Sequence, residues 1–173
     1  MIARATGQFP IVVLMGVSGA GKTTIGTALA ELAGVAFADA DDFHLAANRA
    51  KMAAGFALTD EDRAPWLETL NGLLGGWFRA GAGGVLACSA LKETYRATLG
   101  AGMPARAIQF VLLEGSRELI AARLAARHHV YMNPALLDSQ LATLEAPVDA
   151  LAIVNDRAPE VIAAEILERV SVK

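Results

Sequence analysis

The chain has 173 residues, of which 54% are apolar and 19% are charged. This length favours one domain, and this composition excludes a disordered chain. A net charge of −3, from 15 Lys and Arg against 18 Asp and Glu, argues against nucleic acid as the main partner, because duplex binding usually requires a basic face. The single cysteine, Cys88, excludes an internal disulfide and fits a reducing compartment.

The first apolar run spans 9–17 and is far shorter than the roughly 20 residues needed to cross a bilayer. It leads directly into a glycine-rich segment, with no cleavage site of the usual secretory form. We therefore expect a buried strand here, no membrane association and a cytoplasmic protein.

Apolar runs and helical spacings alternate along the chain. Buried strands are expected at Ile11–Met15, Val35–Ala38, Val85–Cys88, Ile108–Leu113 and Leu151–Val154. Helices are expected at Lys22–Ala33, Ala64–Ala80, Leu91–Leu99, Arg117–Arg127, Ala135–Glu145 and Pro159–Val170. This alternation predicts an α/β fold with a parallel sheet and helices on both faces. Ligands bind at the carboxyl ends of such strands.

The segment after the first expected strand is Gly16-Val-Ser-Gly-Ala-Gly-Lys-Thr23, which fits the phosphate-binding pattern G-x-x-x-x-G-K-[ST]. Glycines allow the backbone to curl so that N–H groups point at phosphate oxygens, and the following helix start adds partial positive charge. We expect Lys22 to act as a catalytic cation on the β- and γ-phosphates and Thr23 to bind Mg²⁺. The residues expected to bind nucleotide here are Gly16, Ser18, Gly19, Ala20, Gly21, Lys22, Thr23 and Thr24.

Two classes of phosphate-loop protein are excluded because the residues typical of them are missing from the later expected strands. A motor or transporter ATPase would end its third strand in a carboxylate, whereas here Cys88 is followed by Ser89 and Ala90. A GTPase would carry Asn-Lys-x-Asp, and the late strand offers only Asn155-Asp156. The chain therefore resembles a small phosphotransferase, which must exclude water rather than activate it.

Acidic residues follow the second expected strand. Asp39 and Asp41 are two residues apart and so point to the same face. We expect Asp39 to serve the metal, through water, and Asp41 to orient or deprotonate an acceptor hydroxyl. Asp42 is expected to cap the next helix, and capping by the whole cluster is the alternative. His44 is a candidate for hydrogen bonding to a polyol, although a single histidine is more often structural.

A further helix start carries a candidate arginine. Thr59 or Asp60 is expected to cap this helix, with Pro65 in its first turn. Arg63 could bind a substrate carboxylate as a fork, or pair with a neighbouring Asp60 or Asp62, and the residues do not decide between these. Trp66 is expected to be core.

Two more cations follow the third expected strand. Lys92 and Arg96 are four residues apart, and we expect them to lie on one helical face and to bind a small anion. A solvated basic face is the alternative for Arg96. Cys88 is expected to be inert packing.

Taken together, these blocks resemble the gluconokinase family of small phosphate-loop kinases. The resemblance covers the chain to about Pro147. The matching blocks are Gly16–Thr23, Asp39–His44, Asn48 with Lys51-Met52, Leu58–Arg63 with Pro65–Leu67, Cys88–Lys92 with Tyr95-Arg96, Leu137–Gln140, and Thr143–Glu145 with Pro147.

The resemblance implies transfer of phosphate from ATP to the 6-hydroxyl of D-gluconate, with Mg²⁺, by a cytoplasmic homodimer. It also implies a nucleoside-monophosphate-kinase-like fold, as one domain over 1–173, with a five-stranded parallel core and a helical lid near 117–147. It favours His44, Arg63, Lys92 and Arg96, beside Asp41, as residues that bind the sugar acid.

The chain departs from the family pattern at two places. Leu45 replaces the usual proline after His44, and the lid segment Arg127–Met132 lacks the usual Gly-His pair. We therefore assign no function to His128 or His129. Arg123 and Arg127 remain candidates for adenine stacking and transition-state charge, with a solvated helix face as the alternative.

Two other functions stay open at this point. Shikimate kinases share the Asp-x-Asp pattern, but a glycine triplet normally follows their third strand, where this chain has Ser89–Lys92. A non-catalytic ATP-binding switch is the second alternative. The presence of Lys22, Thr23, Asp39 and Asp41 argues against it.

Overall fold

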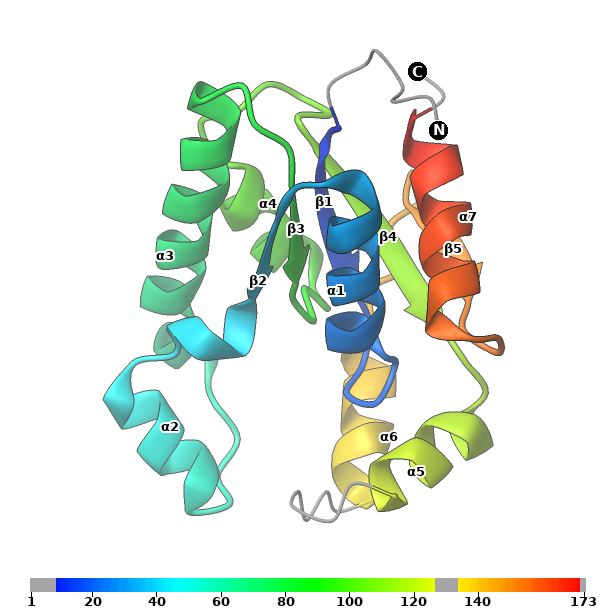
Figure 1. The fold of residues 1–173 in the computed structure, drawn as a ribbon. Coiled ribbons are helices and arrows are strands. Elements are labelled where there is room, and N and C mark those ends of the chain that lie inside the picture. Colours follow the sequence, from blue (N-terminus) through cyan, green and yellow to red (C-terminus); the bar gives the residue numbers. More distant parts are fainter. Residues whose placement is uncertain (1–8, 127–133, 172–173) are drawn as a thin grey trace.

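The computed structural model describes residues 9–126 and 134–171. Its centre is a parallel sheet in the order β2-β3-β1-β4-β5 (Figure 1). The strands are β1 (Ile11–Met15), β2 (Ala36–Asp39), β3 (Gly84–Ala87), β4 (Ile108–Glu114) and β5 (Leu151–Val154). The predicted bounds of β1 and β5 are confirmed, and those of the other three strands differ by one residue at one or both ends. The expected α/β class and five-stranded parallel core are confirmed.

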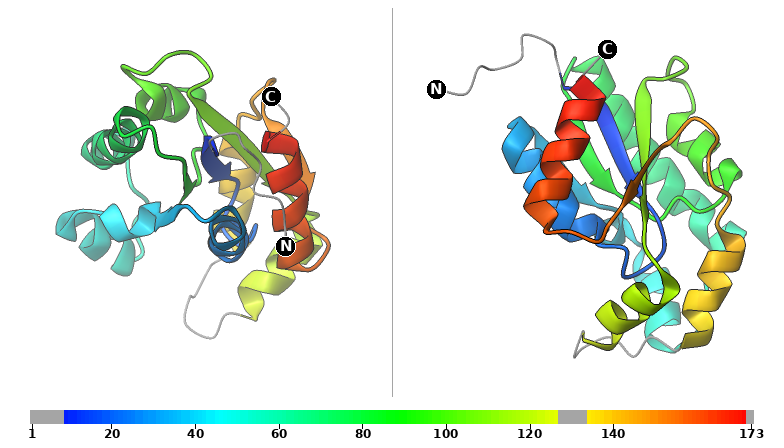
Figure 2. Two further views of the ribbon diagram at one scale, coloured as in Figure 1. Left: turned by 45° about the horizontal axis from the view of Figure 1, so that its top comes forward. Right: turned by 90° about the vertical axis from the view of Figure 1, so that its right-hand side faces the viewer.

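Helices cover both faces of this sheet. They are α1 (Lys22–Ala33), the 3-10 helix η1 (Ala40–Phe43), α2 (Ala46–Ala53), α3 (Asp60–Arg79), α4 (Glu93–Gly100), α5 (Arg117–Ala125), α6 (Pro134–Thr143) and α7 (Pro159–Ser171). The helices α1 and α7 pack on one face, and α3 and α4 pack on the other (Figures 1 and 2). Among the described helices, none combines the length and the apolar character that crossing a bilayer requires.

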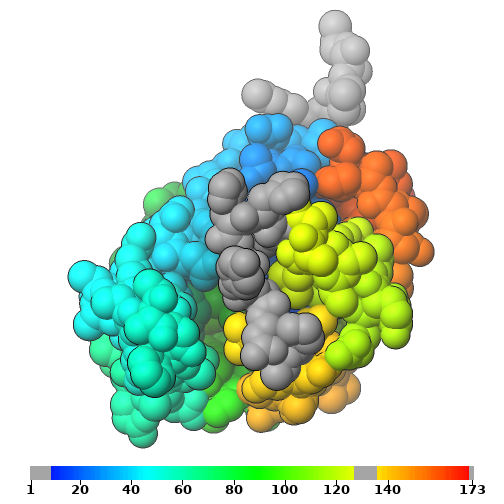
Figure 3. All heavy atoms as spheres, turned by 90° about the horizontal axis from the view of Figure 1, so that it is seen from below, coloured from blue at the N-terminus to red at the C-terminus, as the bar shows by residue number. Residues whose placement is uncertain are grey.

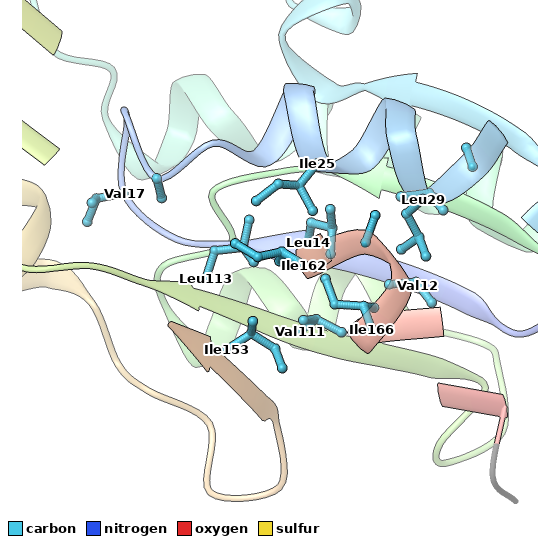
Figure 4. Packing of buried hydrophobic residues seen from close by; sticks show 14 of the residues in the cluster. Val12, Leu14, Val17, Ile25, Leu29, Val111, Leu113, Ile153, Ile162 and Ile166 are labelled. Carbon is cyan, nitrogen blue, oxygen red and sulfur yellow. The ribbon is translucent and has the colours of Figure 1, made fainter. Parts of the chain in front are cut away.

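The central strand β1 is buried along its whole length because helices cover both of its faces. Val12 and Leu14 pack in one cluster with Ile166 of α7 (Figure 4), whereas Val13 and Met15 point to the opposite cluster. Burying one such side chain stabilises the fold by roughly 1.5–3 kcal/mol. The phosphate-binding segment is thus attached to a strand that is buried along its whole length.

Helix α3 begins four residues earlier than predicted, at Asp60 rather than Ala64. Its cap is reciprocal: Thr59 Oγ1 accepts the Asp62 N–H at 3.2 Å, and Asp62 Oδ2 accepts the Thr59 N–H at 2.7 Å. The prediction of Thr59 as a cap is confirmed. Pro65 lies inside α3, beyond the first turn in which we expected it.

The segment between β2 and α3 forms η1 and α2, which the sequence did not predict. Asp39 caps η1 by accepting the Asp41 N–H at 3.0 Å, and α2 has no side-chain cap. The prediction that Asp42 caps the next helix is therefore wrong. Helix α2 is attached instead to the start of α3, where Lys51 is hydrogen-bonded to Asp62.

The phosphate-binding segment, η1, α2, α5 and α6 all lie beyond the carboxyl ends of the strands, at the bottom of Figure 1. Figure 3 views this end directly and shows α2 and α5 on opposite sides of it. The expected lid, near 117–147, includes α5 and α6, whereas 127–133 lie outside the described residues.

Candidate active site

The loop from Gly16 to Thr23 joins β1 to α1, as predicted, and it is packed too closely for side chains at its glycines. Gly19 and Gly21 have φ angles of 82° and 92°, which L-residues rarely adopt. A Cβ atom at Gly19 would lie 2.8 Å from Leu124 Cγ, and one at Gly21 would lie 2.5 Å from Asn155 Nδ2. The loop therefore keeps its shape because glycine alone fits there.

Lys22 curls back over this loop. Its Nζ donates hydrogen bonds to the carbonyl oxygens of Gly16 at 3.0 Å and Val17 at 2.9 Å. This contact places a positive charge beside the backbone that is expected to hold phosphates. The same charge acts on Asp41 and opposes the protonation of its carboxylate.

Thr23 and Asp39 are in direct contact. The Thr23 hydroxyl donates to Asp39 Oδ2 at 2.6 Å, and Asp39 Oδ1 accepts the Asp41 N–H at 3.0 Å. A hydroxyl and a carboxylate supply the hard oxygen ligands that Mg²⁺ prefers. Since Mg²⁺ sites in phosphotransferases take further ligands from substrate phosphates and water, two side chains of this kind could serve as the protein ligands of such a site.

Asp41 extends from η1 into solvent, with 89% of its side chain exposed. Desolvation inside the site and the nearby Asp39 carboxylate raise the pKa of Asp41, and Lys22 opposes that rise. Water reaches most of the side chain, which screens and limits the shift. Asp41 is thus an accessible carboxylate whose pKa is shifted upward, the direction that favours accepting a proton.

His44 is held against Trp66, with ring centroids 4.4 Å apart and planes inclined by 15°. Its side chain is only 7% exposed, its Nε2 lies 3.8 Å from Asp41 Oδ1, and its Nδ1 is buried without a partner among the described residues. Burial lowers the pKa of His44, against the effect of Asp41. Trp66 is core, as predicted, and its Nε1 donates to the Ala40 carbonyl at 2.7 Å.

Four side chains from α3 and the start of α4 form what we call the Asp60 corner: Asp60, Arg63, Lys92 and Tyr95. Lys92 Nζ contacts the two Asp60 oxygens at 2.8 and 3.1 Å, and the Tyr95 hydroxyl donates to Asp60 Oδ1. Arg63 Nη1 donates to the Leu58 carbonyl at 2.7 Å and lies 3.7 Å from Asp60. Of the ion pairs considered for Arg63, the one with Asp60 is present.

The position of Arg96 differs from the one that its four-residue spacing from Lys92 predicted. Lys92 precedes α4 and Arg96 lies within it, so the two do not share a helical face. Arg96 is buried, and its Nη1 donates to the carbonyls of Ala90 at 2.9 Å and Leu91 at 3.2 Å. The solvated face considered for Arg96 is therefore wrong. Its guanidinium braces the turn that leads to Lys92, and direct binding of an anion stays a prediction.

On the opposite side, α5 approaches the loop after β5. Arg123 Nη2 donates to the Asn155 carbonyl at 2.9 Å, while Arg123 Nη1 is buried without a partner among the described residues. Asn155 Nδ2 in turn donates to the Ala20 carbonyl at 2.5 Å. Arg123 is thus brought next to both the late loop and the phosphate loop. Arg127 and the histidines that follow it lie outside the described residues.

Comparison with known proteins gives the family. The family model described as Shikimate kinase matches residues 18–171. The gluconokinase of Gluconobacter oxydans is 44% identical over 159 residues, which cover 90% of this chain and 88% of that protein. The chain belongs to the gluconokinase family.

Solved structures agree with this membership. A sugar kinase from Janibacter is 44% identical to this gluconokinase-family chain, with a TM-score of 0.81 and coverage of 92% and 93% of the two chains. A gluconokinase from Sinorhizobium meliloti is 37% identical, with a TM-score of 0.84 and coverage of 95% and 94%. The predicted family resemblance and kinase fold are confirmed.

Within this gluconokinase-family fold, Gln140 is a residue of the site that no local sequence pattern predicted. Gln140 of α6 accepts the Ser18 N–H at 2.7 Å through Oε1, and its Nε2 donates to Ser18 Oγ at 3.2 Å. It therefore ties the expected lid region to the phosphate loop. Its only indication in the sequence was membership of the family block Leu137–Gln140, because no local pattern connects residues 122 positions apart.

Proposed function

We propose that this chain transfers the γ-phosphoryl group of ATP to the 6-hydroxyl of D-gluconate, giving 6-phospho-D-gluconate and ADP. The observation that supports it most is the placement of two cationic sites at one edge of the sheet. Lys22 contacts the phosphate loop, and Arg63 and Lys92 belong to the Asp60 corner at the starts of α3 and α4. The pKa of His44 is lowered chiefly by burial; the Asp41 carboxylate raises it, and the Arg63 guanidinium lowers it, so both charges act on this ring. A polyanionic donor and a monocarboxylate acceptor require cations at two such separate places.

On the donor side, phosphoryl transfer needs positioning and charge neutralisation more than covalent help. The loop N–H groups and Lys22 hold the triphosphate of ATP. The binding residues in this proposal are Gly16, Ser18, Gly19, Ala20, Gly21, Lys22, Thr23 and Thr24. Arg123 borders the adenine, beside Asn155.

Thr23 and Asp39 hold Mg²⁺ in this proposal. Their side-chain oxygens lie 2.6 Å apart beside the phosphate loop and belong to the ligand class that the ion prefers. When bound, the ion neutralises charge on the β- and γ-phosphate oxygens. The chain's own contribution is to hold these two oxygens together at the start of α1 and the end of β2.

On the acceptor side, Asp41 accepts a hydrogen bond from the 6-hydroxyl and holds its oxygen in line with the γ-phosphorus. As the new O–P bond forms and the bond to the ADP oxygen breaks, the hydroxyl proton passes to Asp41. His44, neutral because burial lowers its pKa, serves the polyol chain as a hydrogen-bonding group. Arg63 and Lys92 bind the carboxylate, with Arg96 bracing their turn.

The lid closes over the donor in this proposal, and Arg127 supplies charge to the transferred phosphoryl group. Closure excludes water and so limits the hydrolysis of ATP. The contacts of α5 with Asn155 and of Gln140 with Ser18 support a lid that is coupled to the phosphate loop.

An acceptor panel tests this function. ADP release is measured in a coupled assay with gluconate, other sugar acids, shikimate and nucleoside monophosphates. We expect turnover with gluconate alone or far above the rest. Turnover with shikimate would identify that kinase activity instead, and no turnover with any acceptor would support the non-catalytic ATP-binding switch.

We also propose a cytoplasmic homodimer. The family resemblance supports both parts of this proposal, and the single cysteine, Cys88, fits a reducing compartment such as the cytoplasm. Cys88 is buried, and burial raises the pKa of its thiol to about 12. Such a thiol is suited to inert packing. Analytical ultracentrifugation should give twice the chain mass of 18.0 kDa, and sedimentation at the mass of one chain would contradict the dimer.

A further inference from the structure

The Asp60 corner contains two residues to which the proposed reaction assigns no function, Asp60 and Tyr95. Asp60 is the first residue of α3, and 56% of its side chain is exposed. Its two oxygens accept hydrogen bonds from Lys92 at 2.8 and 3.1 Å and from the Tyr95 hydroxyl. One carboxylate of α3 thus orients two groups from another part of the chain, Lys92 just before α4 and Tyr95 within it.

Tyr95 also lies beneath both cations. The Arg63 guanidinium carbon is 5.7 Å from the centre of the Tyr95 ring, and Lys92 Nζ is 5.4 Å from it. Cations at this distance from an aromatic ring are attracted to its face. The ring itself is buried, with 8% exposed. Arg63 and Lys92 are therefore held around one fixed ring.

The net charge of the Asp60 corner favours a ligand with one negative charge. Arg63 and Lys92 contribute two positive charges, and Asp60 contributes one negative charge, so the corner has a net charge of +1. Hydrogen bonds from Lys92 and Tyr95 keep Asp60 ionised by lowering its pKa. A single unbalanced positive charge suits an acceptor with one carboxylate.

We propose that Asp60 is a positioning residue of the acceptor site: it holds Lys92 and Tyr95 in place and sets the corner to the charge that a monocarboxylate sugar acid requires. This inference rests on the proposed function. An ammonium group has three N–H donors and a guanidinium has five, so Lys92 and Arg63 can bind a substrate carboxylate while Asp60 stays in place. Restricting the flexible lysine side chain in advance lowers the cost of binding.

The competing idea is that Asp60 imitates the substrate carboxylate and must be displaced by it. The two ideas predict opposite results for Asp60→Asn. If Asp60 positions Lys92, its loss weakens gluconate binding. If Asp60 competes, its loss strengthens gluconate binding.

The first measurement compares Asp60→Asn with Glu61→Gln. Both variants remove one negative charge from the first turn of α3, and Glu61 is exposed. We expect the gluconate KM of Asp60→Asn to rise about tenfold, because a charge-assisted pair is lost. Its kcat should stay within about twofold. Glu61→Gln should keep both values. A lower or unchanged KM in Asp60→Asn would overturn the proposal.

The second measurement is a double-mutant cycle with Lys92→Gln. If Asp60 acts by holding Lys92, then Asp60→Asn should add little to the KM defect of Lys92→Gln. Effects that multiply fully in the double variant would overturn the proposal. Two controls accompany the cycle. The thermal midpoint of each variant detects loss of folding, and its KM for ATP detects damage to the phosphate loop.

Calorimetric titration of gluconate separates this inference from the proposed function. If wild-type protein does not bind gluconate in the presence of a non-hydrolysable ATP analogue, both are wrong. If wild-type protein binds gluconate and Asp60→Asn binds it equally well, only the present inference is wrong. Weaker binding by Asp60→Asn, with unaltered binding by Glu61→Gln, is the expected result.

Discussion

The Thr23 hydroxyl donates a hydrogen bond of 2.6 Å to the Asp39 carboxylate. This contact joins the start of α1 to the end of β2 at the carboxyl edge of the sheet. It brings together the two side chains that the sequence predicted as metal ligands, although 16 residues separate them. A Mg²⁺ site at this place therefore needs no rearrangement of distant elements.

Replacing Asp39 by Asn should weaken the use of Mg²⁺. The substitution removes the charge of one ligand while keeping its size, and losses of roughly 10–100-fold in metal affinity are typical of such changes. We expect the Mg²⁺ concentration for half-maximal turnover to rise by about that factor, with little change in the gluconate KM. Asp42→Asn, in the same segment, is the matched control. Equal Mg²⁺ dependence of both variants would contradict a metal site at Asp39.

The pH profile should identify Asp41 as the group that accepts the proton. Its pKa is raised above the ordinary value of 3.8, first by desolvation and then by Asp39. As the pH falls, Asp41 becomes protonated and can no longer take the hydroxyl proton, so kcat should decline at a higher pH than for an ordinary carboxylate. Asp41→Asn should lower kcat by roughly 10²–10⁴-fold and abolish this acid limb. Persistence of the limb in the variant would assign it to another group.

Asp62 should stabilise the fold in a pH-dependent way. Its pKa is lowered from 3.8 to about 2, chiefly by the hydrogen bond from Lys51 and then by that from the Thr59 N–H. A lowered pKa in the folded state means that stabilisation is complete above pH 3.8 and is lost as the pH falls toward 2.

Thermal unfolding of Asp62→Asn tests this. We expect a melting temperature several degrees below wild type at pH 7, and a difference that narrows as the pH falls below about 4. Glu61→Gln, which neighbours Asp62 in the first turn of α3, should melt close to wild type at both pH values. A difference that does not vary with pH would show that the charge of Asp62 is unimportant.

The parts of the fold that the sequence predicted are those specified locally. The bounds of β1 and α1 follow from an apolar run, the glycine pattern and the stop at Gly34, whose φ is 68°. Helix α2 was missed because it has no side-chain cap and is held by tertiary contacts, among them the hydrogen bond of Asn48 to the Asp62 carbonyl at 2.7 Å. Such contacts leave no periodic pattern.

The residues of the site divide in the same way, into those predicted from local patterns and those brought together by long-range contacts. Thr23 and Asp39 were predicted because each follows a strand at the edge where ligands bind. The partnership of Asp60 with Tyr95 joins residues 35 positions apart, and that of Gln140 with Ser18 joins more distant ones. Arg96 was misjudged for a third reason: helical spacing was assumed from Lys92 onward, whereas Lys92 has an extended backbone, with φ −96° and ψ 149°, and α4 begins only at Glu93.

The last prediction concerns the turn at Ala90, whose φ is 43°. An L-residue in a left-handed conformation costs roughly 1–2 kcal/mol, and Arg96 offsets this cost by donating to the Ala90 and Leu91 carbonyls. Arg96→Ala should therefore destabilise the protein by about 2–4 kcal/mol and raise the gluconate KM, since Lys92 follows the turn directly.

Adding Ala90→Gly to Arg96→Ala should restore part of the stability, because glycine adopts positive φ without steric cost. Ala97→Gly, at an exposed position within α4, is the control and should lower stability further by up to about 1 kcal/mol. Urea unfolding of the three variants measures these differences. Equal loss of stability from the two glycine substitutions would mean that Arg96 does not act through the strained turn.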